Sequence, residues 1–259
     1  IEGGIFGTYA NERLQVGDEL LVMPPQGRFY AELRTDHAKT YVAFAAGSGI
    51  TPVISILKST LVQEPNSRFI LFFGNRGFDH IVFREQLDEL KNRYPGQLAV
   101  HHVLSRESLG SPLLYGRLNG EKCRGYAKYF FTPEAVDHFF LCGPEEMIFE
   151  VKDTLTELGV PAEKIHFELF TTPGTPKKGP FKLSAGPRNS FDASVTVIQD
   201  GMQFDFTLPS DGSTLLDAAM RAGADLPFSC KGGVCSTCKA RILEGNVEME
   251  VNYGLEPDE

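Results

Sequence analysis

The chain of 259 residues has the composition of a globular protein, with 42% hydrophobic and 23% charged residues, and is long enough for more than one domain. Its net charge of −9 and pI near 5.2 argue against a nucleic-acid or anionic-membrane partner, since both bind clustered Lys and Arg, and favour a basic protein partner. Five cysteines, three in one short loop, do not form a secreted disulfide framework, and no apolar run approaches the ~20 residues of a membrane span. We therefore expect a cytoplasmic protein.

Residues 1–36 carry turn signals at short intervals, which predicts the strands of a partial antiparallel β-barrel, one of them at Glu19–Met23. Too few strands are present to close a barrel, so we expect that an upstream part has been cut away. Gly4, Gly7 and Thr8 could bind a phosphate through backbone amides, or form a plain turn.

Residues 37–171 alternate apolar strands with amphipathic helices. This alternation predicts a parallel α/β sheet that is covered on both faces and binds ligands at the carboxyl ends of its strands. Helices are expected after the first strand, around Leu87 and at Met147–Leu158. The expected strands are Tyr41–Ala45, Phe69–Phe73, Leu98–Leu104, Phe139–Cys142 and Lys164–Phe170.

Two of these strands end in glycine turns. The first is followed by Gly47, Ser48, Gly49, Ile50, Thr51 and Pro52, which open a helix and favour a nucleotide phosphate, although Pro52 replaces the last Gly of a full G-x-G-x-x-G fingerprint. The fourth strand ends in Cys142-Gly143-Pro144. Gly143 permits the close approach of a flat ring, while Cys142 could be only a small buried hydrophobe.

The end of the second strand bears on the choice of nucleotide. Asn75 and Arg76 stand where a carboxylate would bind the ribose of NAD, and Arg84 lies further along, at the next helix. Because an arginine pairs with a 2′-phosphate, this pattern favours NADP. The alternative is that both arginines are solvated surface residues.

Residues 172–191 are rich in Pro, Gly and Lys and are typical of an interdomain linker. Residues 192–259 form a further predicted domain of α+β type. A β-hairpin is expected from Ala193–Ile198 and Met202–Leu208 across Asp200-Gly201. A short helix follows at Leu215–Ala222, and a strand is expected at Ala240–Leu243.

Cys230, Cys235 and Cys238 have the spacing C-x4-C-x2-C of a plant-type 2Fe-2S ferredoxin, in which three thiolates come from one loop and a fourth from far downstream. A redox dithiol or half of a zinc site is the alternative, but zinc needs a fourth ligand and no His or Cys follows Cys238. The absent fourth cysteine leads us to expect truncation after Glu259. No Ser/His/Asp set or catalytic carboxylate pair is evident, and the six histidines are interpreted as structural.

A nicotinamide gives two electrons as hydride and an iron–sulfur cluster accepts one, so a chain with both sites needs a flavin between them. This order of a partial barrel with Gly4-Ile5-Phe6-Gly7-Thr8, a nucleotide domain and a ferredoxin loop resembles the ferredoxin–NADP reductase superfamily with a fused ferredoxin. Three segments are most similar to the reductase subunits of phenylacetyl-CoA epoxidases, which are di-iron oxygenases of phenylacetate breakdown. These segments are Met23–Phe29, Gly49–Pro52 and Phe73–Arg76.

The resemblance implies a multidomain fold: the remnant of an FAD-binding barrel in 1–36, an NADP-binding α/β domain in 37–171 and a β-grasp-like 2Fe-2S domain in 192–259. It also implies electron flow from NADPH through FAD and the cluster to the oxygenase component of a multicomponent monooxygenase. The residues implied are Phe6, Gly7 and Thr8 along the FAD pyrophosphate, Thr51 near the flavin, Glu168 and Phe170 beside the isoalloxazine, and Cys142, Gly143 and Pro144 at the nicotinamide.

Two departures from the family are visible: Gly7 stands where the family has Ser, and the Arg-x-Tyr-Ser flavin motif is absent. The alternatives left open are the reductase of another aromatic-ring oxygenase and a non-enzymatic electron carrier or redox sensor that merely binds nucleotide.

Overall fold

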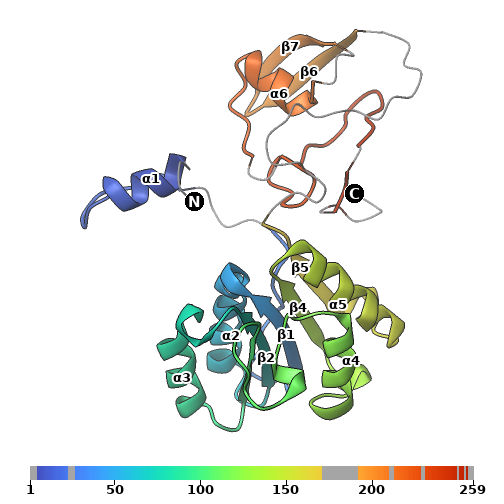
Figure 1. Cartoon of the computed structure of the whole chain (residues 1–259). Helices are drawn as coiled ribbons and strands as arrows, with labels where there is room; N and C mark the ends of the chain where they lie inside the picture. Colours follow the sequence, from blue (N-terminus) through green and yellow to red (C-terminus); the bar gives the residue numbers. More distant parts are fainter. Residues whose placement is uncertain are drawn as a thin grey trace.

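The structure is a computed structural model that describes residues 5–22, 27–170, 192–209, 213–228, 231–249, 251–253 and 255. These residues form an amino-terminal helix, an α/β domain and a carboxyl-terminal unit (Figure 1). The predicted linker, 172–191, lies outside the described residues.

The α/β domain is built on one parallel sheet with the strand order β3-β2-β1-β4-β5. Residues 41–45 of the central strand are completely buried, as expected where helices cover both faces. All five predicted strands are confirmed within two residues at each end. They are β1 (Thr40–Ala46), β2 (Arg68–Asn75), β3 (Leu98–Leu104), β4 (His138–Cys142) and β5 (Ile165–Glu168).

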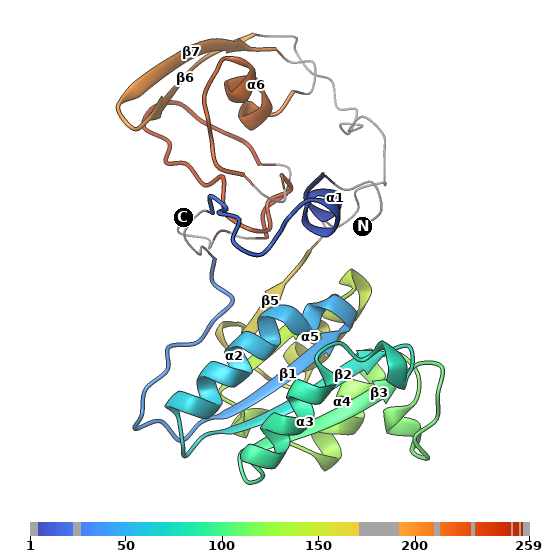
Figure 2. The ribbon, with the colours of Figure 1, turned by 90° about the vertical axis from the view of Figure 1, so that its left-hand side faces the viewer.

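Two helices cover each face of the sheet (Figure 2). On one face α2 (Ile50–Gln63) and α3 (Arg84–Arg93) pack against the side chains of β1 and β2 that include Tyr41 and Phe73. On the other face α4 (Gly120–Tyr129) and α5 (Glu145–Glu157) pack against Phe44 and Phe72. The 3-10 helices of the domain are η1 (Gly47–Gly49), η2 (Phe78–His80), η3 (Pro112–Leu114), η4 (Pro133–Ala135) and η5 (Ala162–Lys164).

The helix α4 is absent from the sequence-based expectations. Its first turn is capped by Asn119, whose side-chain oxygen accepts a hydrogen bond of 2.9 Å from the backbone N–H of Lys122. Cys123 and Tyr126 are the two apolar side chains that are fully buried on this helix, and glycines at positions 120 and 125 lower its helix propensity. Tertiary packing therefore stabilises a helix that local preference does not indicate.

The amino-terminal segment differs from the prediction of barrel strands. Within the described part of residues 1–36, α1 (Ile5–Glu12) is the regular element and Glu19–Met23 forms no described strand. The physical reason is that a strand needs a neighbour for its backbone groups, and none of these residues pairs with one. Phe29 and Leu33 pack instead on the α2 face of the sheet.

The carboxyl-terminal unit contains the predicted hairpin, β6 (Ala193–Gln199) and β7 (Met202–Leu208) in antiparallel register. Asp200 and Gly201 have φ angles of 51° and 81°, as a two-residue turn of type I′ requires. The predicted helix is confirmed as α6 (Leu215–Arg221). The strand expected at Ala240–Leu243 is wrong, since these residues form no ladder and the side chain of Leu243 is 70% exposed.

Candidate functional site

The candidate site lies at the carboxyl ends of β1 and β4, which are neighbours in the sheet. The chain leaves β1 towards β2 on one side, whereas β4 and β5 lie on the other, so the strand order reverses at this point. Ligands of open parallel sheets bind in the crevice at such a reversal. The structure thus brings the two predicted glycine turns together.

Gly49 and Gly143 form the closest approach between these turns. A Cβ atom on Gly49 would collide with the backbone carbonyl group of Cys142 and with the Gly143 amide nitrogen. A Cβ on Gly143 would lie 2.8 Å from Met147 Cε and 3.1 Å from Ala46 Cβ. Glycine at position 49 therefore lets the two turns pack backbone against backbone, and Gly143 lies in a similarly crowded position.

The first turn leads directly into the amino terminus of α2. Gly47 adopts a positive φ of 55°, and the Thr51 hydroxyl donates a 3.0 Å hydrogen bond to the Ser48 carbonyl. Pro52 in the first helical turn removes no intrahelical bond, because its missing N–H would lack a helical partner there. The positive end of the helix dipole at Ile50 suits a phosphate group.

Cys142 and Glu168 are register partners on β4 and β5. Burial, and then the nearby Glu168 carboxylate, raise the pKa of the Cys142 thiol to about 12. Burial likewise raises the pKa of Glu168. The thiol is consequently neutral at physiological pH, and because its side chain is fully buried in the core it fits the alternative of a small buried hydrophobe.

Asn75 carries an orphaned polar group at the end of β2. Its side chain is 9% exposed, and its Nδ2 atom has no hydrogen-bond partner in the described part of the chain. An unpaired buried donor is costly, so this amide fits a bound nucleotide that accepts its hydrogen bond. The backbone carbonyl of Asn75 is held by Ser105 N–H at 2.9 Å, which fixes the loop that follows β2.

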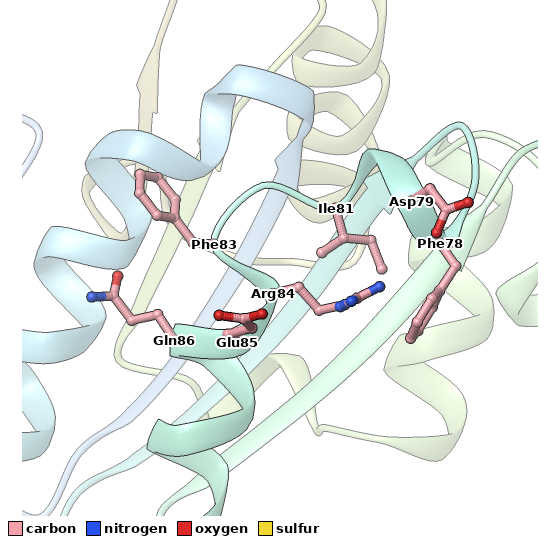
Figure 3. A pocket seen from close by; sticks show the side chains of 7 residues that line it. All are labelled: Phe78, Asp79, Ile81, Phe83, Arg84, Glu85 and Gln86. Carbon is pink, nitrogen blue, oxygen red and sulfur yellow. The ribbon is translucent and has the colours of Figure 1, made fainter.

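Arg76 and Arg84 occupy different surroundings. Arg76 is exposed just beyond β2, whereas the Arg84 guanidinium lies 4.5 Å from the centre of the Phe78 ring. Figure 3 shows Arg84 pointing along a pocket at the start of α3. The pocket is lined by Phe78, Asp79, Ile81, Phe83, Arg84, Glu85 and Gln86.

Phe78 is a site residue that sequence reasoning missed. The available signal was an aromatic residue two positions after Arg76, where a flat surface can flank an adenine or an arginine. The backbone N–H of Phe78 donates a 3.2 Å hydrogen bond to Glu107, which links this loop to the one after β3.

The three residues expected along the FAD pyrophosphate are placed differently from the prediction. Phe6, Gly7 and Thr8 lie within α1, not in a glycine turn, and the Gly7 carbonyl accepts a hydrogen bond from the side chain of Asn11 at 2.7 Å. They belong to the first turn of the helix, where backbone N–H groups have no intrahelical partner, so the structure replaces the expected turn by a helix start and leaves their role towards FAD a prediction. Phe170, beyond β5, is half exposed.

The cysteine loop belongs to the carboxyl-terminal unit. Cys235 is partly buried and Cys238 is exposed, whereas Cys230 lies outside the described residues. Lys231, Gly233 and Ser236 all have positive φ angles, which curls the loop tightly. In the described ranges no three His, Cys, Asp or Glu side chains gather into a metal site, and every histidine of the sequence lies at position 166 or before. The donors available to a metal here are therefore thiols, as an iron–sulfur cluster requires.

Comparison with known families agrees with this division. Residues 44–153 match the model of the oxidoreductase NAD-binding domain, and residues 197–259 match the 2Fe-2S iron-sulfur cluster binding domain. The second match favours the cluster over the zinc or dithiol alternatives. Among the described helices none is both long and apolar enough to cross a membrane.

Similar solved structures support the fold. The chain aligns over 97% of its length with 28% of an intact type IV self-sufficient cytochrome P450 monooxygenase, with a TM-score of 0.64 and 23% identity. It aligns over 64% of its length with 46% of the CS-b5R domains of human Ncb5or in the NAD+ form, with a TM-score of 0.54 and 27% identity.

Curated relatives cover the whole chain. It is 44% identical to one of the subunits of the 1,2-phenylacetyl-CoA epoxidase of Escherichia coli over 100% of the chain and 71% of that protein. It is 32% identical to the ferredoxin reductase component of 3-ketosteroid-9-alpha-monooxygenase from Rhodococcus rhodochrous over 99% of the chain and 69% of that protein. The chain therefore belongs to the family of oxygenase reductase components that join a ferredoxin reductase-type NAD-binding domain to a carboxyl-terminal 2Fe-2S domain.

Proposed function

We propose that this chain takes hydride from NADPH at the crevice between β1 and β4 and delivers single electrons from its 2Fe-2S domain to the di-iron oxygenase component of a phenylacetyl-CoA epoxidase, in the cytoplasm. The observation that carries the proposal is the contact of Gly49 with Cys142 and Gly143, on the same chain as a C-x4-C-x2-C loop. When bound, the nicotinamide supplies a hydride, FAD converts paired electrons to single ones, and the cluster passes them on.

The residues of the crevice would hold and orient the nicotinamide. Gly49 and Gly143 bring the two turns together, Cys142 and Gly143 are proposed to lie beside the nicotinamide, as the family resemblance implies, and Pro144 is the N-cap of α5. Thr51, exposed at the start of α2, is proposed to contact the flavin. Supporting evidence is that each of these residues belongs to one of the two glycine turns that meet at the strand reversal.

Glu168 and Phe170 are proposed to lie beside the flavin ring. Glu168 is partly buried with a raised pKa, so it can carry a proton near neutral pH more readily than an exposed glutamate. Phe170 leaves the sheet next to it with half of its surface exposed. The roles of Phe6, Gly7 and Thr8 toward FAD rest on the sequence resemblance alone.

The preference for NADPH rests on Arg76 and Arg84. Arg76 lies next to the orphaned Asn75 amide, and Arg84 is supported by the Phe78 ring. We expect Arg76→Ala to lower kcat/KM for NADPH about 10- to 100-fold, the value of a charge-assisted hydrogen bond to phosphate, and to spare NADH. Arg93→Ala, which removes an exposed arginine of α3, is the control. Equal losses with both nucleotides would refute the role of Arg76.

The electron acceptor can be tested directly with the purified holoprotein. Its absorbance spectrum must show flavin and iron–sulfur bands, and it must oxidise NADPH steadily with ferricyanide, since a nucleotide-binding sensor would not. Coupled turnover is then compared with a di-iron epoxidase component and with a Rieske oxygenase component. If turnover occurs with the Rieske component and not with the di-iron component, the partner is another aromatic-ring oxygenase and the proposal is wrong.

A further inference from the structure

The carboxyl-terminal unit touches the α/β domain through a small set of apolar side chains. The Tyr253 ring lies 6.1 Å from that of Phe149 on α5, and Phe149 lies 6.4 Å from Phe167 on β5. Val234 packs against the same core cluster as these phenylalanines. We call these four residues the α5 contact. In Figure 1 the carboxyl-terminal unit lies above β5 and the start of α5.

On one side, the α5 contact is tied to the cysteine loop. The backbone N–H of Tyr253 donates a 2.8 Å hydrogen bond to the Gly233 carbonyl. Gly233 has a φ of 70°, and a Cβ there would collide with the Val251 carbonyl, so the two segments are pressed together. Val234 directly precedes Cys235. The side chains of Val234 and Tyr253 consequently move with the loop that bears the cysteines.

On the other side, the contact is tied to the nucleotide site. Phe149 lies on α5, which begins immediately after the Cys142-Gly143-Pro144 turn, and Phe167 directly precedes Glu168. The Lys152 ammonium lies over the Phe167 ring, 5.0 Å from its centre. The same short set of side chains therefore links the cysteine loop to both strands that carry proposed redox-site residues.

We propose that the α5 contact is an intramolecular docking interface that holds the cysteine loop against the nucleotide end of the sheet, with Phe149 and Tyr253 as positioning residues for reduction of the 2Fe-2S cluster. The proposal rests on the proposed function. Two electrons enter with each hydride, whose proton is released, and they leave singly to the oxygenase. The cluster must therefore be reduced and reoxidised twice for each NADPH consumed.

The size of the contact suits reversible docking. An aromatic pair contributes about 0.5–1.5 kcal/mol beyond area burial, which corresponds to roughly a 2- to 13-fold change in the docked-to-released ratio. Tyr253 remains 40% exposed, so the pair is not a closed core. Such a contact orients the loop for electron transfer and still lets it leave towards a partner protein.

Docking can be measured without any turnover, because the chain contains no tryptophan. Tyr253→Trp in the holoprotein places an indole at the contact, and it is the only indole of these 259 residues. Adding Phe149→Leu, which keeps an apolar side chain in the core, should raise the acrylamide quenching constant of this indole at least about twofold. Tyr129→Leu is the matched control, since it removes a ring on α4 that is 66% exposed. An unchanged constant with Phe149→Leu, or an equal rise with Tyr129→Leu, overturns the docking interface.

Stopped-flow absorbance tests the consequence for electron transfer. With Phe149→Leu or Tyr253→Leu, flavin reduction by NADPH should keep its parent rate while bleaching of the cluster slows roughly 2- to 13-fold. The double variant should be no slower than the worse single variant, because both changes break one contact. Parent-like bleaching in both single variants overturns the proposal. A parent protein whose cluster never bleaches would instead overturn the proposed function, and the fluorescence result would still decide the contact.

Discussion

Glu64, at the carboxyl end of α2, allows a quantitative test of what stabilises the α/β domain. Its side chain has no exposed surface and accepts four hydrogen bonds. One oxygen accepts from the Arg34 backbone N–H at 3.0 Å and pairs with His37 Nδ1 at 2.8 Å. The other accepts from the hydroxyls of Tyr41 at 2.8 Å and Ser67 at 2.7 Å.

The cost of Glu64→Gln follows from these partners. The two hydroxyls can rotate and accept from the new amide, while the remaining oxygen keeps its two donors, so all four bonds persist in neutral form. A bond to a charged group contributes about 1 kcal/mol more than a neutral one, which gives roughly 2–4 kcal/mol in total. Glu64→Ala also removes the partner of the buried Tyr41 and Ser67 hydroxyls and should cost about 5 kcal/mol.

Chemical denaturation followed by circular dichroism measures both free energies of unfolding. Glu89→Gln is the control, because that carboxylate is 64% exposed in its pair with Arg93 and should change stability by less than about 0.5 kcal/mol. A cost for Glu64→Gln no larger than that of the control, or a cheaper Glu64→Ala, would refute the reasoning.

Three further predictions concern the site and the pH response. Gly49→Ala should lower NADPH oxidation more than tenfold because its Cβ collides with the backbone after β4, whereas Gly96→Ala, with open space around it, should leave the kinetics unchanged; steady-state rates with ferricyanide decide. Cys142 should resist iodoacetamide at pH 8 in the folded protein, since burial raises its pKa to about 12, and rapid alkylation seen by mass spectrometry would contradict the assignment. Burial, then His166 and Lys39, lower the pKa of His138 from 6.5 to about 4. Because the unfolded chain then binds the proton more readily, the stability that this group contributes is complete above about pH 6.5 and falls as the pH drops towards 4. A free energy of unfolding that increases as the pH is lowered from about 6.5 to 4 would contradict this sign.

The strands of the α/β domain and the hairpin could be read from the sequence because their signals are local. Six consecutive apolar residues before Gly47 predict a strand buried on both faces, and Asp200-Gly201 predicts the turn. The cysteine spacing likewise lies within nine residues of chain. The barrel strands and the strand at Ala240–Leu243 failed because a strand forms only where a second strand pairs with it, and local pattern does not report the partner.

What the sequence determined by itself is therefore the strands of the α/β domain, the hairpin, and the chemistry of the glycine turns and thiols. Only the tertiary structure decided which of them meet: Gly49 against Cys142, Arg84 over Phe78, Glu64 among four donors, and Phe149 against Tyr253. In each of these contacts, apart from that of Glu64 with Ser67, the partners are further apart along the chain than the two, three or four residues over which strand and helix periodicity operate. The contact of Gly49 with Cys142 follows from the strand order, which places β4 next to β1 although β2 and β3 stand between them in the chain.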